Sequence, residues 1–273
     1  MRRLTFLLAF LPSLSFAAAP CEFSAQRDFD VEAAGIETLV LALESDDVEV
    51  EGVAGLEQIQ VRGKACASTE ARLAELVIEQ QRTGKALAIT TRARSSEFRL
   101  FGSSYAYIDI KLRVPESLTI GIRGSSGDAQ VKRVAALDFD TSSGDLVADA
   151  IAGPFGVKTA SGDIRGSGFG SVHIRSTASG DINLRDVRGD VTMERSGSGD
   201  LTLDQVGGGV EIGSVGSGDV SVHHVDRDVV VGAIGSGDVD VSDVGGDLRV
   251  RSSGSGDVSH RGVRGTVSVP QDD

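Results

Sequence analysis

Apolar residues in the second half of the chain recur at offsets of one, three and six residues after an aspartate. After Asp238 these positions hold Val239, Val241 and Val244, and polar residues lie between them. Alternation over so few residues, bounded by glycine, serine and aspartate, is typical of a short β-strand with one buried face. The glycine and β-branched content argues against helix. We therefore expect an inward-facing set made of Leu201, Leu203, Val220, Val222, Val239 and Val241.

Each of these strands follows a four-residue turn that occurs eight times in the chain. The turns read SSGD twice, ASGD twice and GSGD four times, and they end at Asp128, Asp145, Asp163, Asp181, Asp200, Asp219, Asp238 and Asp257. Successive aspartates lie 17, 18, 18, 19, 19, 19 and 19 residues apart. A nearly fixed period of this kind indicates a stacked repeat architecture.

A similar half-unit lies midway between the turns, as at Asp247, Leu248 and Val250. An extended coil of 19 residues has a perimeter of roughly 60 Å, which two short strands and a core about 10 Å thick nearly account for. We therefore expect an all-β fold, a parallel β-solenoid with coils of about 18–19 residues whose equivalent side chains form interior ladders. An antiparallel meander of hairpins is the alternative. Identity over the full period exceeds identity over the half period, which favours parallel stacking.

The same signature occurs once near the N-terminus, where Ser45, Asp46, Asp47 and Val48 match the repeat and Asp46 replaces its glycine. A left-handed turn tolerates aspartate better than most residues, so we expect the solenoid to begin near Ile36. Residues 62–99 are interpreted as a cap or insertion, with a short helix over 68–75 and strands over 76–80 and 86–91. Alternation over 108–114 returns the chain to the stack. This divides the chain into residues 1–17, an N-terminal part over 18–115 and regular repeats over 116–273.

Residues 1–17 have the pattern of an export signal peptide. Arg2 and Arg3 precede an apolar run over 4–16, and Ser15 and Ala17 frame a small-residue cleavage site, so we expect a mature chain that begins at residue 18 in the periplasm or outside the cell. The apolar run is too short to span a membrane. A lipid anchor on Cys21 is the alternative, but Pro20 stands where that processing needs a small residue.

Cys21 and Cys66 are the two cysteines of the chain. An exported protein with two cysteines most simply pairs them, so we expect a Cys21–Cys66 disulfide that ties the N-terminal segment to the cap. Two separate thiols remain the alternative at this stage.

Charge and composition exclude several classes of partner. Net charge is −13 for the whole chain, and it becomes −15 once Arg2 and Arg3 are removed with the signal. Such a surface disfavours nucleic acid and anionic membranes. The chain has no tryptophan and only 4% aromatic residues, which argues against a stacking surface for bases or sugars.

Motifs of enzymatic chemistry are missing from the sequence. It contains no G-x-S-x-G, P-loop, H-E-x-x-H or CxxC pattern, and no cofactor is expected. The histidines are interpreted as surface residues, with the adjacent His223 and His224 on opposite faces of one strand. Arg188, Gly189 and Asp190 spell RGD, but the turn itself demands the glycine and the aspartate.

The eight turn aspartates allow two interpretations. Carboxylates stacked at a strand spacing of about 4.8 Å repel one another by roughly 1 kcal/mol even in water, so something must offset that repulsion. In the structural interpretation each aspartate accepts backbone N–H groups of its own turn. In the functional one the row binds calcium, as in β-rolls, although those use GGxGxD loops that supply further oxygen ligands. GSGD lacks that length, so we favour the structural role and assign no metal site.

The repeated SGD turns at Asp163, Asp181, Asp200 and Asp219 resemble those of the bacterial β-strand-repeat family of putative adhesins, which is related to the head-GIN domain. The resemblance covers most of residues 36–269 and implies a right-handed β-solenoid of the cell envelope, without defined catalytic residues. We therefore expect a non-enzymatic, adhesin-like binding or scaffolding surface, with an envelope protein or glycan as partner. A calcium-binding structural module and a polysaccharide-active β-helix enzyme are the alternatives.

Overall fold

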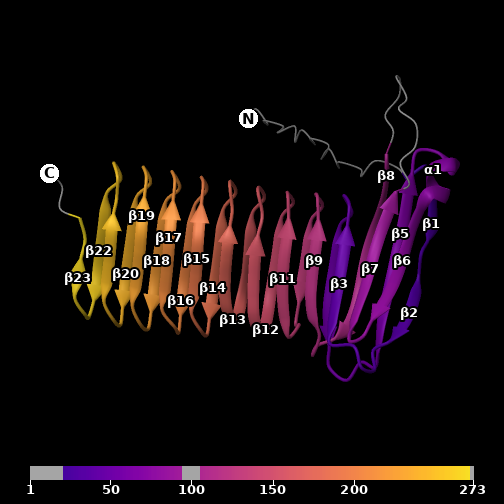
Figure 1. The fold of residues 1–273 in the computed structure, drawn as a ribbon, viewed down its shortest axis with the longest axis horizontal. Coiled ribbons are helices and arrows are strands. Elements are labelled where there is room, and N and C mark those ends of the chain that lie inside the picture. Colours follow the sequence, from indigo (N-terminus) through magenta and orange to yellow (C-terminus); the bar gives the residue numbers. More distant parts are fainter. Residues whose placement is uncertain (1–20, 94–104, 271–273) are drawn as a thin grey trace, which may run out of the picture.

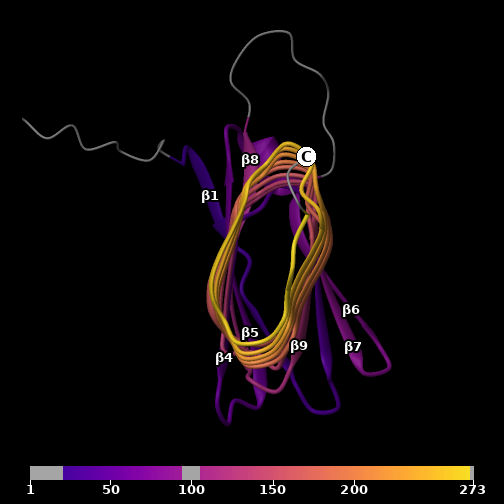
Figure 2. The same cartoon turned by 90° about the vertical axis from the view of Figure 1, so that its left-hand side faces the viewer.

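The structure, a computed structural model, describes residues 21–93 and 105–270. These form one elongated stack of β-coils with two sheet faces, shown from the side in Figure 1 and along its axis in Figure 2. The predicted signal segment, residues 1–17, lies outside the described residues.

The regular repeats build one strand on each face in every coil. One face holds β14 (Ile182–Val187), β16 (Leu201–Val206), β18 (Val220–Val225), β20 (Val239–Val244) and β22 (Val258–Val263), each parallel to the next. The other holds β15 (Val191–Ser196), β17 (Val210–Val215), β19 (Val229–Ile234), β21 (Leu248–Ser252) and β23 (Val267–Ser268), also parallel. The chain winds as a right-handed β-solenoid (Figures 1 and 2). The parallel solenoid is confirmed, and the antiparallel meander is excluded for these repeats.

Longer strands join the two faces in the middle of the stack. The elements here are β9 (Thr119–Gly124), β10 (Ala129–Lys132), β11 (Ala136–Thr141), β12 (Leu146–Lys158) and β13 (Ile164–Ser176). β12 pairs with β10 through its first half and with β11 through its second, and β13 likewise pairs with both β14 and β15. These two strands therefore run around a corner of the solenoid while remaining in register with their neighbours.

The core consists of apolar ladders, as the sequence pattern predicted. Val220 lies opposite Val239, and Val222 lies opposite Val241. The inward-facing set expected from the sequence is no more than 2% exposed: Leu201, Leu203, Val220, Val222, Val239 and Val241.

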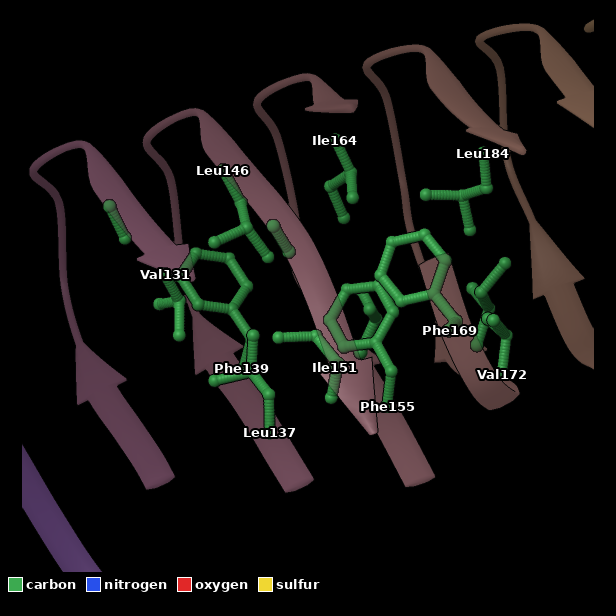
Figure 3. Packing of buried hydrophobic residues seen from close by; sticks show 14 of the residues in the cluster. Val131, Leu137, Phe139, Leu146, Ile151, Phe155, Ile164, Phe169, Val172 and Leu184 are labelled. Carbon is green, nitrogen blue, oxygen red and sulfur yellow. The ribbon is translucent and has the colours of Figure 1, made fainter. Parts of the chain in front are cut away.

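A different packing fills the middle coils. Phe155 and Phe169 stack with ring centroids 4.9 Å apart, and Phe139 lies close by (Figure 3). The ladder of Leu203 and Val222 continues here as Ala148 and Gly166, so the rings occupy space that smaller side chains leave. A Cβ at Gly166 would meet both the Phe169 ring and the Ala148 carbonyl.

Strand alternation breaks at the fifth residue after each turn aspartate. That residue has a left-handed backbone, with φ between 54° and 78°, at Arg133, Ala150, Gly168, Asp186, Gln205, His224, Asp243 and Gly262. Six of these eight residues are not glycine, although a side chain makes this conformation unfavourable. Because the backbone turns here, the sixth residue points inward again, while the fourth and fifth both face outward.

The first coil of the sequence does not lie at the end of the stack. β3 (Thr38–Leu43) lies between β7 (Ala86–Ala93) and β9, and β4 (Val48–Val53) lies between β8 (Ala106–Pro115) and β10. The strands that follow residue 62 therefore add a further coil on the outer side of the first one.

Antiparallel strands continue both faces beyond that coil. β5 (Gln58–Ala67) pairs with β8, and β1 (Phe23–Gln26) and β2 (Phe29–Glu32) pair with β5. On the other face β6 (Leu76–Thr83) forms a hairpin with β7. The expected helix is α1 (Glu70–Glu75), which begins after Thr69, whose Oγ1 accepts the Arg72 N–H. Within the expected cap, residues 62–99, lie α1, β6 and β7, while β1, β2 and the start of β5 precede it. The cap and the domain boundary at residue 115 stay an interpretation.

Candidate binding surface

The turn aspartates form a continuous hydrogen-bonded ladder along one corner of the solenoid. From Asp47 to Asp238, the Oδ1 atom of each aspartate accepts the backbone N–H of the aspartate one coil further on, over 2.8–3.0 Å, and the last donor is the Asp257 N–H. Backbone N–H groups are thus the partners, but they belong to the next coil and not to the aspartate's own turn. The ladder also includes Asp47, from the imperfect copy of the turn near the N-terminus.

The structure gives other reasons than the sequence did for the aspartate at position 46 and for the glycine of the repeated turn. Asp46 does not adopt a left-handed backbone. Its side chain is buried and its Oδ1 accepts the Ile108 N–H at 2.7 Å, so it joins the first coil to β8. Burial is the main cause that raises the pKa of Asp46. Gly199 has φ +114°, and a Cβ there would also collide with the carbonyl of Gly180 in the preceding coil, so both conformation and close stacking require glycine.

A shorter ladder follows the opposite corner. Asp190 accepts the Gly209 N–H, Asp228 accepts the Asp247 N–H, and Asp247 accepts the Thr266 N–H, over 2.7–2.8 Å. In the RGD tripeptide, Asp190 therefore has a structural hydrogen bond, and the Arg188 guanidinium donates to the Ala152 carbonyl at 2.7 Å. These contacts give the tripeptide a structural role in this turn.

The ladder aspartates use Oδ1 for the next coil and are exposed, except Asp163, which is half-buried and whose Oδ2 accepts from the Arg165 guanidinium at 2.5 Å. Within the described part of the chain, no group of three or more histidine, cysteine, aspartate or glutamate side chains converges as metal ligands would. Calcium binding by this row stays a hypothesis to be tested in solution.

A disulfide joins Cys21 to Cys66, with Cα atoms 5.6 Å apart. Cys66 lies in β5, and Ser24 of β1 lies directly opposite it. The bond therefore fastens the start of the described chain to the antiparallel strands at the N-terminal end of the stack. No cysteine in the described residues is free, which favours the disulfide over the two separate thiols.

A polar hollow, which the sequence did not indicate, lies on the face built by β14, β16, β18, β20 and β22. The hollow has a volume of about 550 Å³ and is lined by side chains from five coils: Asn183, Arg185, Thr202, Asp204, His223, His224, Ser242, Asp243 and Arg261. His223 and His224 both line it, so their expected placement on opposite faces is wrong. The left-handed backbone at His224, with φ 54°, breaks the alternation and turns both side chains outward.

Hydrogen bonds fix the two imidazole rings in this hollow. His223 Nδ1 lies 2.8 Å from Ser242 Oγ, and Ser242 is buried. His224 Nδ1 lies 2.8 Å from Asp204 Oδ1, and its Nε2 lies 3.7 Å from Asp243 Oδ2. The ring of His224 therefore bridges two carboxylates that come from the coils on either side of it.

Two arginines stand at the ends of the same hollow. Strand register places Arg185, Asp204, His223, Ser242 and Arg261 in one column across five coils. Neither Arg185 nor Arg261 has an ion pair with any other described residue, whereas Lys111 and Arg133 elsewhere do. In the sequence, the hollow could have been located from the polar residues at the fourth and fifth positions after each turn aspartate.

Two side chains with raised pKa values lie on β8, far from this hollow. Burial, and then the Asp47 carboxylate, raises the pKa of Asp109. Burial also raises the pKa of Tyr107, and Asp109 adds to that effect. Asp109, Asp47, Asp128 and Asp145 all line a shallow acidic depression near the N-terminal end.

Among the helices that the structure describes, none is both long and apolar enough to cross a bilayer.

A family model described as Toastrack DUF4097 matches residues 36–222, and no curated protein matches the chain. Several crystal structures are similar in outline. A putative lipid binding protein from Parabacteroides distasonis is 16% identical, with a TM-score of 0.49 over 87% of this chain and 97% of that one. A putative adhesin from Bacteroides fragilis is 14% identical, with a TM-score of 0.39 over 89% and 99%. A putative cell adhesion protein from Clostridium sporogenes is 13% identical, with a TM-score of 0.35 over 89% and 100%.

Proposed function

The chain belongs to the Toastrack DUF4097 family, whose model matches residues 36–222, and we propose that it is an exported, non-enzymatic β-solenoid that binds or scaffolds components of the cell envelope. Export is supported by the basic and apolar pattern of residues 1–17. The Cys21–Cys66 disulfide is consistent with an oxidising compartment outside the cytoplasm.

The binding role rests on the polar hollow on the face of β14, β16, β18, β20 and β22. Five coils each contribute side chains to one surface, and parallel register holds these coils in fixed positions. A site on strands is held more precisely than a site on loops. The surface is therefore suited to a partner that makes many contacts along the solenoid axis, which is the adhesin-like role proposed here.

A binding role also agrees with how the ionisable groups of the hollow are used. A glycoside-cleaving site needs one carboxylate as general acid and another as nucleophile or base. In this hollow the His224 ring already lies between Asp204 and Asp243. We therefore propose that these groups contact a partner and carry out no bond cleavage.

Two experiments test the proposal. The full chain and a chain lacking residues 2–17 are expressed in a Gram-negative host, and fractionation is expected to find only the full chain outside the cytoplasm. The purified protein is then sedimented with cell-envelope fragments, and saturable co-sedimentation is expected. A full chain that stays in the cytoplasm would refute export, and non-saturable or absent sedimentation would refute envelope binding.

A further inference from the structure

The polar hollow combines strong hydrogen-bond donors and strong acceptors within one lining. Arg185 and Arg261 supply guanidinium donors at its two ends, and Asp204 and Asp243 supply carboxylate acceptors between them. Asn183 adds a side chain that can both donate and accept. With neutral histidines the charges of the two arginines and the two aspartates cancel, in a chain whose net charge is −13.

This balance disfavours charged ligands of either sign. An anionic polymer would face Asp204 and Asp243 and would be repelled by the net negative charge of the chain. A cationic ligand would face Arg185 and Arg261 at the ends of the column. An apolar ligand would have to desolvate these polar groups without replacing their hydrogen bonds, which is costly.

Hydroxyl groups match the lining better because each one both donates and accepts hydrogen bonds. A carboxylate or histidine nitrogen can accept from a hydroxyl that in turn accepts from a guanidinium. The column from Arg185 to Arg261 repeats at each coil, about every 4.8 Å. A ligand lying along the solenoid axis therefore meets a new polar group at each step.

From this geometry we propose that the polar hollow binds a neutral, polyhydroxylated chain, a neutral glycan, lying along the solenoid axis between Arg185 and Arg261. The inference rests on the proposed envelope-binding role and names its ligand class. Affinity comes from hydrogen bonds repeated over several coils, because no phenylalanine, tyrosine or tryptophan of the described chain lines the hollow. His223 is held by Ser242 and His224 by Asp204, which fixes the ring orientations before the ligand arrives.

Native affinity electrophoresis of the purified protein tests this proposal. The gels contain a mixed-linkage β-glucan, a galactomannan or dextran as neutral polymers, polygalacturonate as the acidic polymer, and glycol chitosan as the cationic one. Retardation by at least one neutral polymer is expected, and polygalacturonate should not retard the protein more strongly. Glycol chitosan serves only as the control for non-specific attraction between a cationic polymer and a chain of net charge −13.

Two variants and one control variant locate the site. Arg185→Ala with Arg261→Ala is expected to weaken binding of the neutral polymer about tenfold or more. Arg249→Ala with Arg251→Ala removes the same charge from β21 on the opposite face and should leave binding unchanged. His224→Gly should weaken binding without disturbing the backbone, because glycine already occupies the same coil position at Gly168 and Gly262.

The possible results separate this inference from the broader function. No retardation by any neutral polymer, or retardation that survives the Arg185 and Arg261 changes, would overturn the glycan proposal. If the protein still sedimented saturably with envelope fragments, the envelope-binding role would stand and its partner would be of another class. Stronger retardation by polygalacturonate than by every neutral polymer would show that the ligand is acidic.

Discussion

Placing a carboxylate inside the apolar ladder tests the inward assignment of the strands. Leu203 is 0% exposed and lies between Leu184 and Val222 of the neighbouring coils. Thr202, the residue before it, lies on the outer face and lines the polar hollow. We expect Leu203→Asp to destabilise the protein strongly and Thr202→Asp to change its stability little.

The cost of Leu203→Asp can be estimated in two parts. Loss of a buried leucine side chain removes about 2 kcal/mol of hydrophobic stabilisation. The new carboxyl stays protonated in the core, and keeping it so at pH 7 costs about 4 kcal/mol, from about 1.4 kcal/mol per pH unit above its unfolded pKa of about 3.9. The total is about 6 kcal/mol at pH 7 and about 2 kcal/mol near pH 4. Because the folded state holds the extra proton, stability falls as pH rises.

Urea unfolding of both variants and the unmodified protein at pH 4 and pH 7 measures this difference. Thr202→Asp is the matched control, since it adds the same charge one residue away on β16. A cost for Leu203→Asp that did not grow between pH 4 and pH 7, or that equalled the cost of Thr202→Asp, would refute the inward placement of the ladder.

Three further predictions concern the ladder and the buried carboxyl. Asp219→Ala should lower the free energy of unfolding by about 1 to 2 kcal/mol, because the Asp238 N–H loses its acceptor; Asp219→Asn keeps an acceptor oxygen and should cost little, and equal losses would contradict the hydrogen-bond role. The melting temperature should be the same in millimolar calcium as in chelator. If calcium bound the ladder, a concentration 100-fold above its dissociation constant would raise the free energy of unfolding by about 2.7 kcal/mol. The raised pKa of Asp46 means that the folded state binds its proton more tightly, so stability falls as pH rises above the ordinary value of 3.8. Asp46→Asn should therefore unfold at higher urea concentration than the unmodified protein at pH 7 and show no such gain at pH 3; a pH-independent difference would contradict the burial effect.

The sequence alone determined the architecture, because every level of its pattern agrees. Offsets of one, three and six residues fix which side chains are buried, and the constant spacing of the turns fixes parallel register between Val220 and Val239. The helix after Thr69 and the hairpin from Leu76 to Ala93 were also predictable, since capping and turn residues act over a few neighbours.

Contacts between distant residues were decided only by the tertiary structure. The outer position of β7 and β8 beyond the first coil depends on strand pairing across more than 40 residues, which no local pattern encodes. The donors to the aspartate ladder lie one coil away, because stacking brings the next turn's N–H closer to each carboxylate than its own turn does. The polar hollow required the left-handed residue at His224, which turns two adjacent side chains to one face and breaks the alternation on which the sequence interpretation relied.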